Sequence, residues 1–105
     1  MIKKTESLVW EQGQVKGFAG KSLIDLKNGS LKMVKVKPFA IYPAHLHPSK
    51  TEFIFVLEGK PNITIGEKEY NTKKNDFITL PKNIKHSIEN HTDTECIILV
   101  GSIVE

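Results

Sequence analysis

Three histidines and one glutamate are the residues of this 105-residue chain whose types and spacing suggest chemistry. Two of the histidines form the triplet His45-Leu46-His47. In a strand, residues two apart point to the same side with Cα atoms about 6.5 Å apart, so both imidazoles can reach one ion. Glu52 would bring a carboxylate beside them if the strand that it opens pairs back on the first. His86, which follows a predicted turn, would add a third imidazole from another strand.

Three imidazole nitrogens and one carboxylate oxygen suit a first-row divalent metal ion. We therefore expect one divalent transition metal ion as the cofactor, with iron, manganese, nickel, copper, cobalt and zinc all compatible. Four protein ligands on a six-coordinate ion leave two positions open, which permits Lewis-acid chemistry or dioxygen binding. The alternative is that these histidines lie on the surface or in the core of a barrel that binds no metal.

The elements that must position these residues are predicted to be short strands. Turn-forming residues recur at short intervals, and the segments between them are rich in β-branched and aromatic residues. Examples of these segments are Leu31–Val36, Glu52–Leu57, Asn62–Ile65, Phe77–Leu80 and Glu95–Val104. Such a pattern predicts an all-β sandwich or barrel, with at most one helical turn near the N-terminus.

Alternation within the strands predicts which side chains face the interior. Val34 and Val36 are expected on one face and Lys35 and Lys37 on the other. If Glu52 and His86 point inward, residues at even spacing from them should line an apolar pocket, although a bulge would shift the register by one. The residues expected to line this pocket are Ile54, Val56, Ile63, Ile65, Ile84 and Ile88.

The segment Phe53–Leu57 is apolar on both faces, unlike the alternating strands. A strand of this kind is covered on both sides, here by the interior and by a second layer or a partner subunit. We therefore expect a homodimer.

Two stretches of the chain resemble the two sequence motifs of the cupin superfamily, in its small single-domain, type-2-like form. The first stretch, at about 39–59, contains His45-x-His47-x4-Glu52-x6-Gly59, and the second, at about 75–90, contains Pro81-x-Asn83-x2-His86-x3-Asn90. The resemblance implies a single cupin-type jelly-roll β-barrel over residues 1–105, with the metal inside. It assigns His45, His47, Glu52 and His86 as the metal ligands. It also implies dimers, which small members often form by exchanging N-terminal strands.

The chain departs from the family pattern where Phe39, Asn75 and Asn83 stand at positions that are glycine in the family. Asparagine tolerates a left-handed backbone better than other non-glycine residues, so the last two changes are mild. A phenylalanine does not share this tolerance.

The remaining candidates are given mainly structural roles. Asn90 is expected either to support the ligands from behind or to stabilise a turn, with the turn favoured. His91 is expected in a solvated hairpin, and Cys96 is expected to pack as a small hydrophobe. Tyr42 and Tyr70 are expected to pack structurally, with a place in the pocket wall as the alternative.

Charge and composition exclude several function classes. All fifteen basic residues are lysines, the formal net charge is +3, and no arginine is present for bidentate recognition of phosphates or guanine edges. We therefore expect no nucleic-acid partner. A sugar-nucleotide epimerase is also disfavoured, because such an enzyme needs phosphate clamps and further acid–base residues. The single cysteine and the lack of long apolar runs predict a cytoplasmic protein without a membrane partner.

The expected function is a small metal-binding cupin that acts on a small molecule. A metal-dependent dioxygenase acting on a largely apolar or aromatic substrate comes first, since oxygen chemistry needs no extra general base. An isomerase or lyase comes next. The alternative is a non-catalytic, metal-dependent module that binds or senses a small molecule, and a metal-free structural barrel is the third possibility.

Overall fold

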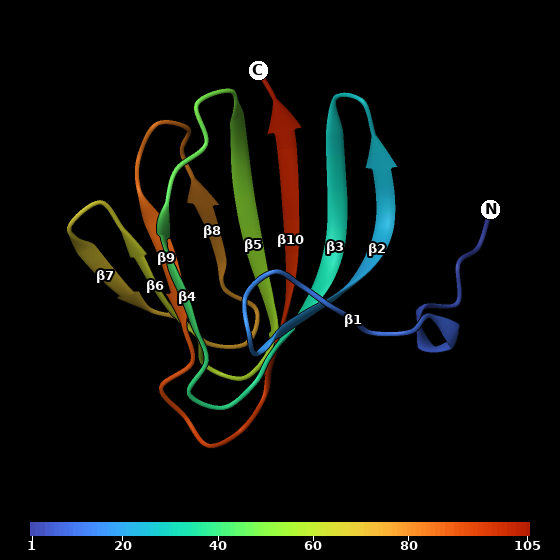
Figure 1. Ribbon diagram of the computed structural model, residues 1–105, viewed down its shortest axis with the longest axis horizontal. Helices are drawn as coiled ribbons and strands as arrows, with labels where there is room; N and C mark the ends of the chain where they lie inside the picture. The colour runs from blue at the N-terminus through green and yellow to red at the C-terminus, as the bar shows by residue number, and fades with distance from the viewer.

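Two antiparallel sheets lie face to face in the computed structural model, which describes residues 1–105 (Figure 1). The six-stranded sheet has the order β1 (Glu11–Gln12), β2 (Phe18–Leu26), β3 (Gly29–Val36), β10 (Cys96–Val104), β5 (Lys50–Glu58), β8 (Phe77–Leu80). The four-stranded sheet has the order β4 (Ile41–His45), β9 (His86–Glu89), β6 (Asn62–Ile65), β7 (Lys68–Asn71). One 3-10 turn, η1 (Thr5–Ser7), precedes the strands. The predicted all-β class is confirmed.

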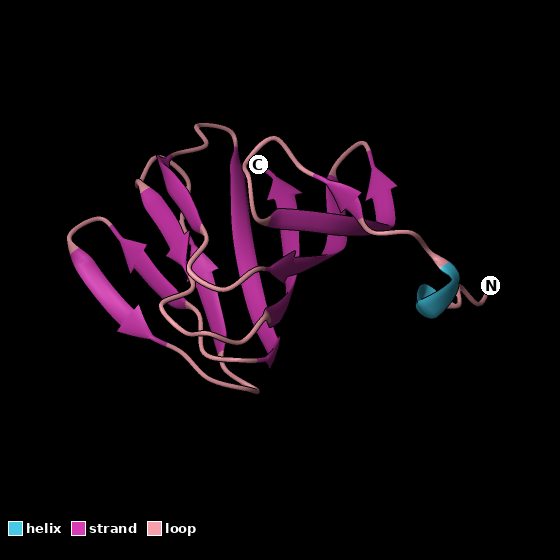
Figure 2. Cartoon of the chain, turned by 60° about the horizontal axis from the view of Figure 1, so that its bottom comes forward, coloured by secondary structure: helices cyan, strands magenta, loops and turns pink.

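After β3, the chain crosses repeatedly between the two sheets, as in a jelly roll. It passes from β3 to β4, back to β5, and later from β8 to β9 and back to β10. Hydrogen bonds do not join the two sheets into one closed barrel, so the fold is a jelly-roll β-sandwich (Figure 2). Because of these crossings, β4 and β9 face β5 across the interior.

The core lies between the sheets, and strand alternation explains its composition. Val34 and Val36 are 7% and 0% exposed, whereas Lys35 lies on the opposite face of β3, as predicted. Burying one such side chain stabilises the fold by roughly 1.5–3 kcal/mol. The buried hydrophobic residues are Phe18, Val34, Val36, Ile54, Val56, Ile63, Leu80, Ile88, Cys96, Ile98 and Val100.

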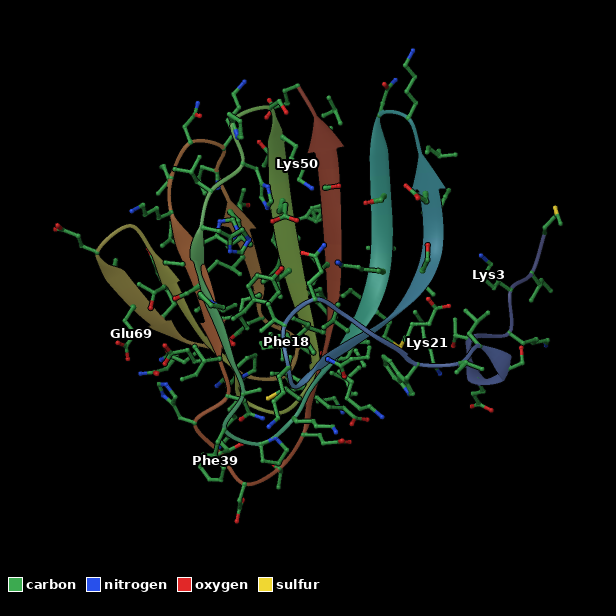
Figure 3. The ribbon with its side chains drawn as sticks, in the orientation of Figure 1. Lys3, Phe18, Lys21, Phe39, Lys50 and Glu69 are labelled. Carbon is green, nitrogen blue, oxygen red and sulfur yellow. The ribbon has the colours of Figure 1, made fainter.

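The three positions at which the chain departs from the family pattern all have a left-handed backbone. The φ angles are 61° at Phe39, 77° at Asn75 and 66° at Asn83. The backbone therefore keeps the conformation that suits glycine, although a left-handed phenylalanine costs about 1–2 kcal/mol. The Phe39 side chain is 65% exposed and lies at the lower end of the molecule in Figure 3.

The outer face of the six-stranded sheet is also apolar. Phe53 packs its ring directly over Gly101, where an added Cβ would lie 2.3 Å from the ring atoms. The ring of Phe53 also lies 5.8 Å from that of Phe77, which is 61% exposed. The apolar residues of this outer face are Leu31, Met33, Phe53, Phe55, Leu57, Phe77, Ile97 and Leu99.

The N-terminal segment packs against the edge of the six-stranded sheet. Trp10 lies beside two ammonium groups, with Lys21 Nζ 4.5 Å and Lys35 Nζ 4.7 Å from its ring centroid. The strand β1 then pairs with β2 of the same chain. The segment that joins β1 to β2 passes in front of the space between the sheets (Figure 1).

Candidate metal centre

The structure brings the four ligands suggested by the sequence together at one point of the interior. One ligand atom from each of His45, His47, Glu52 and His86 lies within 4.8 Å of the other three. His45 ends β4 and pairs in register with His86 of β9, while Glu52 faces them from β5. His47 follows β4 in the loop that leads to β5.

A β-bulge in β4 orients His45. Tyr42 pairs with Ile88 and His45 pairs with His86, so β4 has one more residue than β9 over this stretch. Both Tyr42 and His45 consequently face the interior. His45 Nδ1 donates a hydrogen bond to the carbonyl oxygen of Pro43 in the bulge, at 2.9 Å. Because Nδ1 holds the proton, Nε2 keeps its lone pair for a metal ion.

Glu52 is the anionic member of the cluster and is 13% exposed in its side chain. Its Oε1 lies 3.1 Å from His47 Nε2 and 3.3 Å from His86 Nε2, and its Oε2 lies 3.9 Å from Lys50 Nζ. Burial is the largest single influence and raises the pKa of Glu52, but the contacts with His86, His47 and Lys50 together outweigh it. The net result is a lowered pKa, so the carboxylate is ionised and available as a ligand.

His47 is held in the neutral form that metal binding requires. Burial is the main cause of its lowered pKa. Glu52 opposes this shift, whereas the ammonium of Lys50 and the nearby imidazoles of His45 and His86 add to it. A neutral imidazole suits a ligand, since a protonated nitrogen cannot coordinate a metal.

His86 gives the test of whether a metal ion fits this cluster. Its side chain is 2% exposed, and neither Nδ1 nor Nε2 has a hydrogen-bond partner, since the 3.3 Å contact with Glu52 lacks hydrogen-bond alignment. Leaving a buried polar group unpaired costs about 1–3 kcal/mol. An ion coordinated by Nε2 would give that nitrogen its partner. The donor set of three imidazoles and one carboxylate also suits a first-row divalent ion.

A cavity of about 480 Å³ adjoins the cluster. Its apolar wall includes side chains from both sheets, among them the T-shaped pair Phe18 and Tyr42, whose ring centroids are 5.1 Å apart. The apolar lining residues are Phe18, Ala19, Val34, Tyr42, Leu80, Ile88, Ile98 and Val100.

Of the six isoleucines and valines predicted to line the pocket, only Ile88 does so. Ile54, Val56 and Ile63 do face inward, but they are 0% exposed and lie in the packed core. Ile65 is half-buried and packs against that core. Strand alternation predicts the direction of these side chains but not their depth in the sandwich, and the cavity occupies only one end of it.

The prediction that Ile84 lines the pocket is wrong for a different reason. Ile84 is 41% exposed in the turn that precedes β9. Strand alternation does not extend back from His86, because Asn83 has a left-handed backbone and ends the regular strand geometry. Ile84 therefore does not line the cavity, and its side chain lies beside Gly66.

Two lysines of the cavity lining, Lys32 and Lys50, were not foreseen. The sequence carried a signal for both, since Lys32 is two residues before Val34 and Lys50 two residues before Glu52. The same alternation that directs Val34 and Glu52 inward directs these lysines inward.

Asn90 stabilises a loop and does not touch the ligands. It is 0% exposed, and its Nδ2 donates to the carbonyl oxygens of Val36, Lys37 and Thr94. Its Oδ1 accepts hydrogen bonds from the backbone N–H and the hydroxyl of Thr92. Support of the ligands from behind is therefore wrong, and the turn interpretation holds.

The other candidates also have structural surroundings, apart from Tyr42. His91 is exposed and contacts Glu89. Cys96 is buried, and that burial raises the pKa of its thiol above the ordinary value. Tyr70 is half-buried beneath the ammonium of Lys68 and does not line the cavity.

The fold and the site together define the class of protein. The Cupin domain family matches residues 32–101, well over half of the chain, and the protein belongs to that family. No helix of the structure is long and apolar enough to cross a membrane.

Curated relatives match the chain over part of their length. A germin-like protein (subfamily 2 member 1) of Arabidopsis thaliana is 32% identical over 77 residues, which are 69% of this chain and 35% of that protein. The mannose-1-phosphate guanylyltransferase RfbM of Salmonella typhimurium is 33% identical over 64 residues, 61% of this chain and 13% of that protein. The chain thus spans about a third or less of the length of these two relatives.

Solved structures share the fold at low identity. A predicted oxalate decarboxylase from Thermotoga maritima superposes with a TM-score of 0.92 at 19% identity, over 100% of both chains. The polyketide cyclase RemF from Streptomyces resistomycificus superposes with a TM-score of 0.85 at 23% identity, over 100% of this chain and 81% of that one.

Proposed function

We propose that this protein binds one divalent transition metal ion through His45, His47, Glu52 and His86 and acts as a dioxygenase on a small, largely apolar molecule. The observation that carries the metal site is His86, a buried imidazole whose two nitrogens lack partners, within 4.8 Å of three further ligand atoms. A bound ion would supply Lewis-acid and redox chemistry at its open coordination positions.

The residues of the chain would divide the remaining tasks. Glu52 offsets part of the positive charge of the ion, and the hydrogen bond from His45 to Pro43 fixes the direction of its Nε2. The apolar walls exclude water from the reacting molecule and strengthen electrostatic interactions inside the cavity.

The choice of an oxygenase rests on what else lines the cavity. Apart from the four ligands, its titratable side chains are Glu11, Tyr42 and lysines, and Glu11 lies on the exposed edge strand β1. An isomerase or lyase needs a well-placed general base in addition to the ion. The same scarcity of acid–base groups favours the second candidate function, a module that binds or senses a small molecule at the ion without converting it.

Two measurements separate these functions. Elemental analysis of protein purified from its natural host should find about one transition metal ion per chain, and none after metal reconstitution would refute the metal site. Oxygen consumption by the ferrous and manganous forms, across a panel of small apolar and aromatic molecules, should exceed that of the Glu52→Gln variant. No turnover with either metal, despite full occupancy, would favour the binding module.

A homodimer is part of the proposal. The outer face of the six-stranded sheet is apolar from β3 through β10 and β5 to β8, and Phe77 at its margin is 61% exposed. A second copy on this face would remove the exposed aromatic area from water. A monomer mass by light scattering at high concentration would contradict it. We also propose a cytoplasmic location, which suits the free thiol of the buried Cys96.

A further inference from the structure

The cavity beside the proposed metal site is lined by ammonium groups that are not metal ligands. Lys32 and Lys50 both line it, Lys32 from β3 and Lys50 from the first position of β5 (Figure 3 labels Lys50). Lys32 is exposed and takes part in none of the ion pairs of the structure, which makes its ammonium available to a ligand. Lys50 lies 3.9 Å from Glu52 Oε2, longer than a charge-assisted hydrogen bond.

A third lysine of the cavity rim, Lys21, is already engaged elsewhere. Its Nζ donates to the carbonyl oxygen of Thr5 at 3.0 Å and lies over the ring of Trp10. It pairs in register with Met33, on the outer face of the sheet. Lys21 therefore contributes its backbone to the rim and its charge to the N-terminal segment.

The floor between Lys32 and the metal ligands is apolar. Lys32 pairs in register with Val100 of β10, and Val100 pairs with Ile54 of β5, two residues beyond Glu52. The strands β3 and β5 are two strand spacings apart, which is about 10 Å. A ligand that touches both Lys32 and the ligand cluster would thus cross Val100, with Val34 and Ile98 also in the wall.

We propose that the ligand of this cavity is a small organic carboxylate with an apolar body, whose carboxylate is bound by Lys32 and whose body lies on Val34, Ile98 and Val100 between Lys32 and the metal ligands. The inference rests on the proposed function, since it names the substrate class of that same site. Lys50 adds positive potential beside Glu52 and favours an anion further.

The lining favours a carboxylate over a phosphate ester. The chain has no arginine, so it has no fork for bidentate phosphate binding. One free ammonium matches the single charge of a carboxylate, and Val34, Ile98 and Val100 offer apolar contacts between Lys32 and the metal ligands, beside the polar Ser22 that pairs with Lys32. The cavity lining has two carboxylates. Glu52 contacts the imidazoles of His47 and His86, and Glu11 lies on the edge strand β1.

Calorimetric binding of three probes of matched size tests the inference: phenylacetate, its neutral analogue phenylacetamide, and phenyl phosphate. We expect phenylacetate to bind the metal-loaded protein about tenfold more tightly than phenylacetamide. The Lys32→Met variant should lose about tenfold in affinity for phenylacetate, which is near the lower limit for one hydrogen bond to a charged group because Lys32 is exposed, and should keep its affinity for phenylacetamide. Its metal content should equal that of the wild type.

The matched control is Lys27→Met, which removes the same charge from the exposed turn between β2 and β3 and should change neither affinity. Equal binding of phenylacetate and phenylacetamide, no detectable binding of either, an equal effect of both variants, or tighter binding of phenyl phosphate would each overturn the carboxylate assignment.

Repeating the titrations after chelation separates this inference from the proposed function. Lys32 does not belong to the ligand cluster, so discrimination between phenylacetate and phenylacetamide should persist, at lower affinity, in chelated protein. A protein that takes up no metal but keeps the Lys32-dependent discrimination would refute the metal function alone. A protein that binds its metal but shows no such discrimination would refute the carboxylate inference alone.

Discussion

Replacing His86 by leucine should stabilise the metal-free protein while abolishing its response to metal. His86 is 2% exposed, and both ring nitrogens lack hydrogen-bond partners. Removing such a buried unpaired group gains about 1–3 kcal/mol. Leucine is close in size to histidine, so little cavity strain is expected. The opposing effect is the lost contact with Glu52, which keeps His47 and Lys50 as neighbours.

The net gain in the free energy of unfolding should be about 1–2 kcal/mol. This is less than the full value of about 1–3 kcal/mol for an unpaired buried group, because Glu52 loses one partner. For a domain of this size, each 1 kcal/mol moves the thermal midpoint by about 4–8 °C. Thermal unfolding of chelated wild type and His86→Leu measures this shift. The control is His91→Leu, an exposed substitution expected to change stability by less than about 0.5 kcal/mol.

Metal addition should then reverse the order of stability. Wild-type protein at a metal concentration a hundred times its dissociation constant should gain about 2.7 kcal/mol, while His86→Leu should gain little or nothing. A chelated His86→Leu protein that is less stable than chelated wild type would show that the nitrogens of His86 are satisfied without metal. Full metal stabilisation of the variant would show that His86 is not a ligand.

Three further outcomes are expected. His47→Ala should weaken metal binding by more than the roughly 10–100-fold that is typical when a residue hydrogen-bonded to a metal ligand is lost. The purified variant should therefore contain almost no metal by mass spectrometry, and normal occupancy would exclude His47 as a ligand. Acidification should release the ion below about pH 6, because protons then compete with the metal for the imidazole nitrogens. The pKa values of His47 and Glu52 are lowered from their ordinary 6.5 and 4.5, so these two groups also stabilise the fold above those values and lose that contribution as the pH falls. Metal retained after dialysis at pH 4.5 would count against histidine ligands. Phe39→Gly should raise the urea midpoint by an amount equivalent to about 0.5–1 kcal/mol of unfolding free energy. The change removes about 1–2 kcal/mol of left-handed strain, while the more flexible glycine costs roughly 0.5–1 kcal/mol of backbone entropy on folding. A lower midpoint would show that the exposed ring of Phe39 makes a stabilising contact.

The ligand cluster could be predicted from the sequence because most of its members lie close together along the chain and within recognisable motifs. His45 and His47 are two residues apart, and the motif spacing assigned Glu52 and His86, although Glu52 reaches the histidines from β5 in the facing sheet and not from a strand paired with β4. The class of fold was predictable for a similar reason, since short alternating segments separated by turns have few alternatives to a sandwich or barrel.

The pocket wall was less predictable because it depends on depth and on irregularities. Parity gives the direction of Ile54 but not its distance from the open end of the sandwich. A turn residue such as Ile84 follows no strand alternation at all. Lys32 was overlooked because the alternation was followed only from Val34 to Lys37, although the spacing of Lys32 from Val34 also indicates an inward direction.

The bulge in β4 makes the metal site sensitive to the length of the chain as well as to its composition. Tyr42 and His45 are an odd number of positions apart, and only the extra residue around Pro43 and Ala44 lets both of them face inward. Deleting either Pro43 or Ala44 would leave every ligand in the sequence, yet a regular strand would turn one of the two aromatic rings to the solvent. Natural variants of this segment should therefore tolerate exchanges of residue type at these two positions far better than the loss of one.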